Sequence, residues 1–198
     1  MIVKTILTDM YDENCHLFAD ETTKECGIVD PGLGANKIAD TIDSLGFVPK
    51  YIILTHAHMD HVGSVVELSK KYNIPFYVSK VDEEYMEKDD FVYGNLPKAS
   101  GYLKEGDTLT MGNHIVNVIE TPGHTKGGLC FLVEDKLFTG DTLFRGSVGR
   151  TDFIGGSSSE LLRSIKDKLF TLDENIEVYS GHGPMTTIGF EKKYNPFF

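Results

Sequence analysis

A dense group of potential metal ligands follows an apolar stretch in the first third of the chain. The run Tyr51 to Thr55 leads directly into four potential ligands within six positions, His56, His58, Asp60 and His61. In an extended backbone His56 and His58 point the same way, because side chains alternate with a period of two. Imidazole and carboxylate groups suit Zn²⁺, Fe²⁺ or Mn²⁺, and imidazoles clustered in a core without a metal would be poorly satisfied. The segment therefore predicts a metal site.

Three further segments each end a short apolar run with a potential ligand beside glycine. They are Thr-Pro-Gly-His at 121–124, Thr-Gly-Asp at 139–141 and Ser-Gly-His-Gly at 180–183. Glycine lets the backbone approach closely and adopt a positive φ, as metal-site loops often require. One zinc typically takes four ligands, whereas two metals can share a carboxylate and a water. We therefore expect two divalent metals, because the four segments together offer seven ligands: His56, His58, Asp60, His61, His124, Asp141 and His182.

The elements that must position these ligands alternate along the chain. Apolar, β-branched runs bounded by turn residues predict strands at 2–8, 16–19, 26–29, 51–55, 76–79, 114–119, 129–133, 137–139 and 176–179. Apolar residues at helical spacing predict helices at 35–45, 64–72, 81–87 and 158–170, the last with a capping box of Ser157 and Glu160. This order indicates a mixed α/β class. With no linker and no repeat, residues 1–198 are expected to form one domain.

Composition narrows the classes of partner. The 30 acidic residues against 19 basic ones give a formal charge of −11, which disfavours binding to a phosphate backbone. Cys15, Cys26 and Cys130 lack the spacing of a disulfide or zinc framework and are expected as buried thiols. No apolar run approaches the roughly 18 residues of a membrane span. We expect a cytoplasmic protein that acts on a small molecule, without nucleic acid or membrane partners.

An acidic run lies between two of the ligand segments. Residues 82–90 hold six acidic residues and one lysine. The run is interpreted as a solvated helix face or an exposed loop, with no function assigned to it.

The candidate ligands lie in four motifs: His-Ala-His-Met-Asp-His at 56–61, Thr-Pro-Gly-His at 121–124, Gly-Asp-Thr-Leu-Phe at 140–144 and Gly-His-Gly at 181–183. Together these motifs resemble those of the metallo-β-lactamase superfamily and its glyoxalase II-like branch. The resemblance covers nearly the whole chain and implies an αββα sandwich, the metallo-β-lactamase-like fold, with the metals at one edge. It also implies the ligand sets: His56, His58 and His124 for one metal, Asp60, His61 and His182 for the other, and Asp141 as the bridge. Asp30 would lie beside the ligands, although a turn or a helix cap explains it equally well. Zinc is the first expectation, with iron or manganese as alternatives.

The implied activity is metal-dependent hydrolysis of a thioester such as S-D-lactoylglutathione. A hydroxide shared by the metals would attack the acyl carbon, with Asp60 orienting that nucleophile. Arg145 and Arg150 follow Asp141 and could bind a substrate carboxylate. Alternatively, Arg150 fixes its loop through backbone carbonyl groups. Two-domain glyoxalase II proteins carry a glutathione-binding helical domain after the last histidine ligand. We do not expect that domain here, because only 16 residues follow His182.

Several other functions stay open at this point. Persulfide dioxygenases of the same superfamily share the histidine cluster and a stretch like Gly149 to Phe153, and they use one iron and oxygen. Lactonases have the same ligand set. A zinc β-lactamase is less expected, because those enzymes have Cys or Ser at the position of Asp141. A tRNA-processing nuclease is disfavoured by the acidic charge. A structural or sensor protein without turnover is disfavoured because structural zinc sites are usually closed and rich in cysteine.

Overall fold

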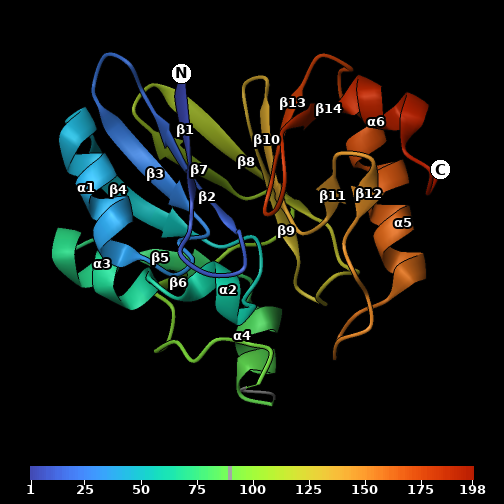
Figure 1. Ribbon diagram of the computed structural model, residues 1–198, viewed down its shortest axis with the longest axis horizontal. Coiled ribbons are helices and arrows are strands. Elements are labelled where there is room, and N and C mark those ends of the chain that lie inside the picture. The colour runs from blue at the N-terminus through green and yellow to red at the C-terminus, as the bar shows by residue number, and fades with distance from the viewer. Residues whose placement is uncertain (89–90) are drawn as a thin grey trace.

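The N-terminal half of the chain forms a six-stranded sheet in the computed structural model, which describes residues 1–88 and 91–198. Its strands lie in chain order: β1 (Ile2–Leu7), β2 (Asn14–Ala19), β3 (Glu25–Val29), β4 (Val48–Ile53), β5 (Phe76–Val78) and β6 (Gly101–Tyr102). The first three strands pair antiparallel and the others parallel. The helices α1 (Ala35–Leu45) and α3 (Val65–Tyr72) connect the parallel strands and cover the outer face (Figure 1). The carboxyl ends of β3 and β4 therefore meet at one edge of the sheet.

The C-terminal half forms a second six-stranded sheet in the order β14-β13-β10-β9-β8-β7. Its strands are β7 (Thr108–Met111), β8 (His114–Glu120), β9 (Leu129–Val133), β10 (Lys136–Gly140), β13 (Glu177–Ser180) and β14 (Thr186–Thr187). Strands β10 and β13 run parallel, joined through α5 (Ser158–Asp167) and the 3₁₀ turn η1 (Leu169–Thr171). With α6 (Ile188–Tyr194), α5 covers the outer face of this sheet (Figure 1).

Three apolar layers hold the sheets and helices together. In the first sheet, neighbouring residues of one strand point to opposite faces, as period-two alternation requires. Leu17 packs with the α1 and α3 side chains, whereas Phe18 packs between the two sheets against residues such as Phe131 and Phe138. A third layer joins the second sheet to α5 and α6 through residues such as Val178 and Ile165. The αββα sandwich is thus confirmed.

Every predicted strand and helix is present, and most of the elements that the prediction missed are short. Helix α1 has the expected bounds, and the Ser157 side chain accepts a hydrogen bond from the Glu160 backbone N–H at 3.3 Å. The last predicted helix instead ends at Asp167 and continues as η1. The prediction missed β7, α6 and the single turn α2 (Met59–Val62). It also missed the two-residue strands, which include the hairpin of β11 (Leu143–Phe144) and β12 (Ser147–Val148). Most are too short to show a periodic pattern.

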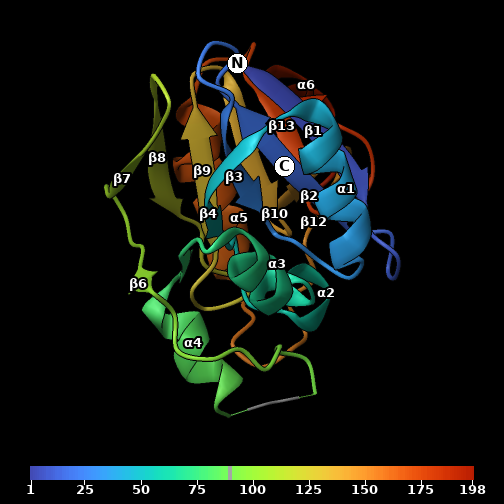
Figure 2. The same ribbon diagram turned by 90° about the vertical axis from the view of Figure 1, so that its left-hand side faces the viewer.

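The acidic run does not behave uniformly. Helix α4 (Lys80–Met86) places Glu83 and Glu84 at its accessible side, but Asp82 is fully buried. The interpretation of the whole run as solvated was therefore wrong for Asp82, because its carboxylate is enclosed by backbone donors that are described below. Asp89 and Asp90 lie outside the described residues. Figure 2 shows α4 beyond the sheets, at the same end of the molecule as α2.

All three cysteines are buried and unpaired, as expected. Among the helices of residues 1–88 and 91–198, none has the length and apolar character needed to cross a membrane.

Candidate metal centre

The potential ligands lie just beyond the carboxyl ends of strands from both sheets. His56 and His58 follow β4, and the turn α2 then carries Asp60 and His61. In the second sheet, β8, β10 and β13 are followed in the same way by the remaining three, His124, Asp141 and His182. A backbone hydrogen bond of 2.7 Å from Leu129 N–H to Thr55 C=O joins the two sheets at this edge. Residues up to 126 positions apart along the chain, His56 and His182, thus meet at one end of the sandwich.

Three histidines form the first ligand group. The facing ring nitrogens of His56, His58 and His124 all lie within 4.8 Å of one another. Nε2 of His124 is 3.0 Å from Nδ1 of His58. All three residues are at least 96% buried, and burial lowers the pKa of each, that of His58 to about 3. The neutral imidazole that results is the form that binds a metal.

A second group contains one carboxylate and two histidines. The ligand atoms of Asp60, His61 and His182 also lie within 4.8 Å of one another. Oδ2 of Asp60 is 3.3 Å from Nε2 of His182 and 3.7 Å from Nε2 of His61. Burial alone would lower the pKa of His182, but the hydrogen bond to Asp60 and the charge of Asp141 outweigh it and raise the pKa. This group therefore favours a positive charge.

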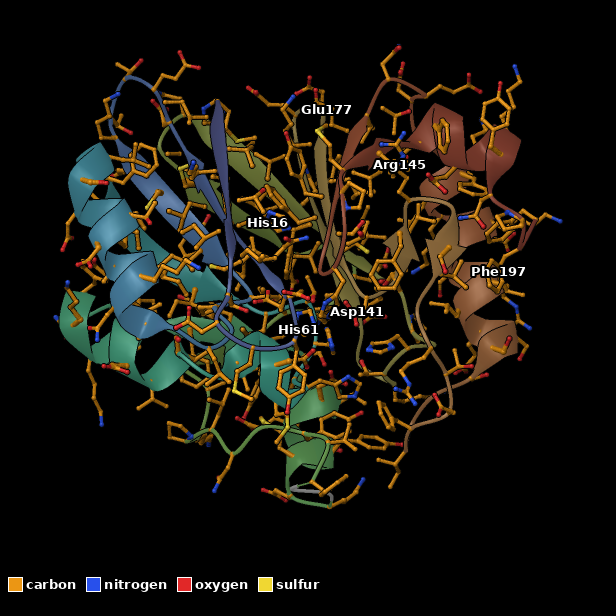
Figure 3. All side chains as sticks on the ribbon, viewed as in Figure 1. His16, His61, Asp141, Arg145, Glu177 and Phe197 are labelled. Carbon is orange, nitrogen blue, oxygen red and sulfur yellow. The ribbon has the colours of Figure 1, made fainter. Side chains whose placement is uncertain are left out.

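Asp141 lies between the two groups. Its Oδ1 is 3.4 Å from Nε2 of His61, whereas its Oδ2 is 3.6 Å from Nε2 of His124 and 3.7 Å from Nε2 of His182. Figure 3 labels His61 and Asp141 close together, near the ends of the strands that precede them. Burial opposes ionisation of Asp141, but the facing His61 outweighs burial and lowers the pKa of the carboxyl. An ionised Asp141 thus presents its two oxygens to different ligand groups.

Hydrogen bonds on the far side of the rings orient three of the histidines. Nδ1–H of His61 donates to Oδ2 of Asp30 at 3.0 Å, and Nδ1–H of His124 donates to the main-chain carbonyl of Arg150 at 2.7 Å. Nδ1 of His56 is 3.0 Å from the Thr55 hydroxyl, which itself donates to Asp30 at 2.5 Å. Each contact leaves the lone pair of Nε2 aimed at the centre.

Several of the atoms that face the centre lack a partner within the described part of the chain. Nε2 of His56, Nε2 of His61 and Oδ1 of Asp141 are buried and make no well-formed hydrogen bond there. Buried polar atoms without partners are costly and rare in native structures. A divalent cation would satisfy these atoms, and the nitrogen and carboxylate donor set is one that zinc, iron or manganese accepts. The residues therefore fit a metal centre.

Glycine is required at two positions beside the ligands. Gly140 has a φ of +47°, and a Cβ there would lie 2.0 Å from the Thr55 hydroxyl oxygen. A Cβ on Gly181 would lie 2.4 Å from Oδ1 of Asp141. These glycines let two chain segments pass close to the ligands, which explains the recurrent pairing of glycine and ligand in the sequence.

Asp82 is a buried residue of this region that sequence reasoning did not select. Its Oδ2 accepts hydrogen bonds from Ala57 N–H and from the Thr125 hydroxyl, both at 3.0 Å, while its Oδ1 accepts from Gly127 N–H at 2.8 Å. One carboxylate thus ties the loop of His56 and His58 to that of His124. The pattern of Ser79 followed by Asp82 indicates the start of a helix, where the Ser79 hydroxyl accepts from Asp82 N–H, but it does not indicate burial.

A cavity of about 800 Å³ opens over the centre, and Asp60, His58, His124, Asp141 and His182 line it. Arg150 also lines this cavity. Arg145 is not among the described residues that line the cavity. Its guanidinium lies 5.4 Å from the centre of the Phe190 ring, and Figure 3 shows Arg145 well away from Asp141. The structure thus brings only one of the two arginines to the centre. The remaining lining is largely apolar, which the sequence analysis did not anticipate.

The chain is similar to known proteins over nearly its full length. A family model of the metallo-beta-lactamase superfamily matches residues 9–182. A protein of Haemophilus influenzae named hydroxyacylglutathione hydrolase GloC is 34% identical over 100% of this chain and 98% of its own length.

Two solved structures share the whole architecture. The crystal structure of BLEG-1 B3 metallo-beta-lactamase superimposes with a TM-score of 0.91 at 34% identity and covers 99% of each chain. The structure of TTHA1623 in a di-iron-bound form gives a TM-score of 0.88 at 33% identity and covers 98% of this chain and 100% of that one.

Proposed function

The chain belongs to the metallo-beta-lactamase superfamily, and from that premise we propose that it is a metal-dependent hydrolase that cleaves thioesters with two divalent metals. Zinc is the first candidate, with iron or manganese as alternatives. Membership of a superfamily that consists mostly of hydrolases supports the reaction class, and the name of the Haemophilus influenzae relative supports the thioester.

The observation that carries the proposal is the position of Asp141 between two compact groups of potential ligands. A mononuclear site would need only His56, His58 and His124, whose ring nitrogens already converge. The second group is equally compact, and Asp141 reaches both groups within 3.7 Å. This arrangement offers ligands for two metals. The persulfide dioxygenases that share the histidine cluster use one iron, so the number of metals per chain separates the two functions. The di-iron form of the similar protein TTHA1623 is consistent with two metals.

Two metals held by these residues would supply Lewis acidity, lowering the pKa of water and polarising a carbonyl group. The chain itself contributes the orientation of the reacting groups. Asp60 lines the cavity and is partly exposed to it, so its carboxylate can accept a hydrogen bond from a water that faces the substrate. Asp30 lies behind the ligands and holds His61 in one orientation through Nδ1. Arg150 lines the same cavity and can bind one acidic or carbonyl group of a substrate.

A thioester suits a centre of this kind because its leaving group is weakly basic. The pKa of a free thiol is about 8.5, so a thiolate departs without prior protonation. The chain would then need to orient the water and the acyl carbon but would not need a strong general acid.

The decisive measurement combines metal stoichiometry with a substrate panel. Protein purified without added metal should hold close to two metals per chain and should hydrolyse thioesters faster than β-lactams or lactones. One iron per chain with rapid oxygen uptake on glutathione persulfide would overturn the hydrolase assignment, and faster hydrolysis of a β-lactam or a lactone would overturn the thioester.

Two variants separate catalysis from a purely structural metal site. Asp60→Asn and His58→Ala should each lower kcat by at least a hundredfold while the circular dichroism spectrum is retained. Glu84→Gln is the control, because Glu84 lies exposed on α4, where it forms a 4.0 Å ion pair with Lys80. Full activity in both site variants would contradict a catalytic centre.

A further inference from the structure

The walls of the cavity over the metal centre are mostly apolar. Apart from the candidate ligands, nine described residues line it, and seven of them are apolar or aromatic: Tyr11, Met59, Phe91, Val92, Phe144, Val148 and Phe153. Three of these seven, Tyr11, Met59 and Phe91, are large side chains that are 58%, 42% and 82% exposed. Exposed apolar side chains that converge on one concave surface indicate a binding site for an apolar group.

Aromatic rings flank both ligand groups. The Phe153 ring lies 5.7 Å from the His58 ring, and the Phe144 ring lies 6.3 Å from the His182 ring, both in edge-to-face arrangements. Both rings also line the cavity, so a substrate whose acyl carbon reaches the centre can contact Phe144 and Phe153. Its acyl group would exchange water for aromatic surface in doing so.

The same walls offer little to a polyanionic substrate. Among the described lining residues, Arg150 is the only arginine or lysine. Its guanidinium donates two hydrogen bonds of 2.7 Å to the Asp152 carboxylate and lies 4.0 Å from the centre of the Phe153 ring. The tripeptide glutathione carries two carboxylates, so at least one of them would find no arginine or lysine partner in this lining. The cavity volume of about 800 Å³ is large enough for a substrate of drug-like size.

We propose that the natural substrate is a thioester with an apolar, aromatic-sized acyl group and at most one negative charge near the reacting bond, with the acyl group seated between Phe144 and Phe153. This inference rests on the proposed thioester hydrolysis and narrows it. The thiol part need not be glutathione, because the described walls provide no second arginine or lysine for it.

The test uses four substrates on the metal-loaded protein: the acetyl and the phenylacetyl thioesters of N-acetylcysteamine and of glutathione. The kcat/KM for each compound is divided by the rate constant of its hydroxide-catalysed hydrolysis, which corrects for intrinsic reactivity. Burial of the phenyl group should raise kcat/KM about tenfold to a hundredfold over acetyl on both thiols. Glutathione should give no more than a twofold gain over N-acetylcysteamine. A preference for acetylglutathione over phenylacetyl-N-acetylcysteamine would overturn the inference and leave the thioester function intact.

A binding measurement separates this inference from the reaction itself. Calorimetry should show that the thioether S-(2-phenylethyl)-N-acetylcysteamine binds at least tenfold more tightly than S-methyl-N-acetylcysteamine. If the thioether binds in this way while none of the four thioesters is hydrolysed, the thioester function is overturned and the apolar specificity of the cavity is supported. Equal binding of the two thioethers would overturn the apolar specificity.

Two aromatic residues give a matched pair of variants. Phe153 and Phe190 each lie under an arginine, but only Phe153 lines the cavity. Phe153→Ala should lower the ratio of phenylacetyl to acetyl kcat/KM at least fivefold, whereas Phe190→Ala should leave the ratio as it is. Phe144→Ala gives a second lining variant with the same expected loss. An unaltered ratio in both Phe153→Ala and Phe144→Ala would overturn the proposed seat of the acyl group.

Discussion

The main-chain carbonyl of Arg150 accepts a 2.7 Å hydrogen bond from Nδ1–H of His124. This contact fixes which nitrogen of His124 carries the proton and leaves Nε2 free to face Asp141. The Arg150 side chain has a different role, because its guanidinium is paired with Asp152 at the protein surface. Position 150 therefore acts on the metal centre through its backbone and on the cavity through its side chain.

Replacement of Arg150 by alanine should consequently spare the metal centre. We expect Arg150→Ala to retain the metal stoichiometry of the parent protein, because the alanine backbone supplies the same carbonyl. KM should rise several-fold for a thioester with a carboxylate near the acyl group and less than twofold for an uncharged one. Plasma emission spectroscopy and steady-state kinetics would measure both. Arg163→Ala, on the exposed face of α5, serves as the control, and loss of metal from Arg150→Ala alone would refute the backbone role.

Asp82 should matter to the metal centre although it contacts none of the candidate ligands. Asp82→Ala would leave Ala57 N–H, Gly127 N–H and the Thr125 hydroxyl without their shared acceptor. Each buried donor without a partner costs about 1–3 kcal/mol, so the free energy of unfolding should fall by about 3 kcal/mol or more. Because two ligand loops lose their common anchor, metal affinity measured by competition with a chelator should fall at least tenfold.

Glu84→Gln on the same helix provides the comparison for Asp82→Ala. Its side chain is 56% exposed, so both unfolding and metal affinity should match the parent protein. If Asp82→Ala lost stability but kept the parent metal affinity, Asp82 would be a core residue with no influence on the ligand loops.

The sequence was sufficient to select a set of candidate ligands that the fold brings together, and its resemblance to a known family was sufficient for the layers, but neither indicated what surrounds the ligands. The candidate ligands were recognisable because histidine and carboxylate residues beside glycine at strand ends are chemically conspicuous. Asp82 was not, because its burial depends on where α4 packs and neither charge nor spacing encodes that packing. Phe144 and Phe153 could not be separated from core residues, since an apolar side chain in a loop has the same sequence signature whether it faces a cavity or the interior.

The C-terminal helix α6 should control the shape of the cavity through Glu191. The Glu191 carboxylate is buried and accepts hydrogen bonds from Gly146 N–H at 2.9 Å and from the Thr186 hydroxyl at 2.5 Å. Asn195 binds the same carboxylate and the Ser147 carbonyl. These contacts hold the β11–β12 hairpin, which carries Phe144 and other cavity residues.

Glu191→Ala should therefore loosen the hairpin more than it damages the centre. We expect the free energy of unfolding to fall by about 2–4 kcal/mol, from the buried donors left without an acceptor. KM should rise at least fivefold with a smaller effect on kcat, and amide hydrogen exchange at 143–148 should accelerate. Lys192→Ala is the control, because Lys192 pairs with Glu174 at the surface. Unchanged exchange in the hairpin of Glu191→Ala would contradict this link.

His16 should make stability depend on pH independently of the metal ligands. The residue is buried between the sheets, where its Nδ1 accepts from the Thr5 hydroxyl and its Nε2–H donates to the Ser180 carbonyl, both at 3.0 Å. Burial lowers the pKa of His16 from 6.5 to about 4. Between these two values the unfolded chain takes up a proton that the folded protein does not, so stability is full above pH 6.5 and falls as the pH drops toward 4.

The contribution can be isolated by comparing the parent protein with His16→Gln, which cannot titrate. Since one pKa unit corresponds to about 1.4 kcal/mol, the stability advantage of the parent should shrink by about 2.5 kcal/mol between pH 7.5 and pH 4.5. Urea unfolding of both metal-free proteins at the two pH values would measure it, and the titration of other groups cancels in the difference. A stability gap that stays constant over this range would show that His16 is not held neutral in the folded protein.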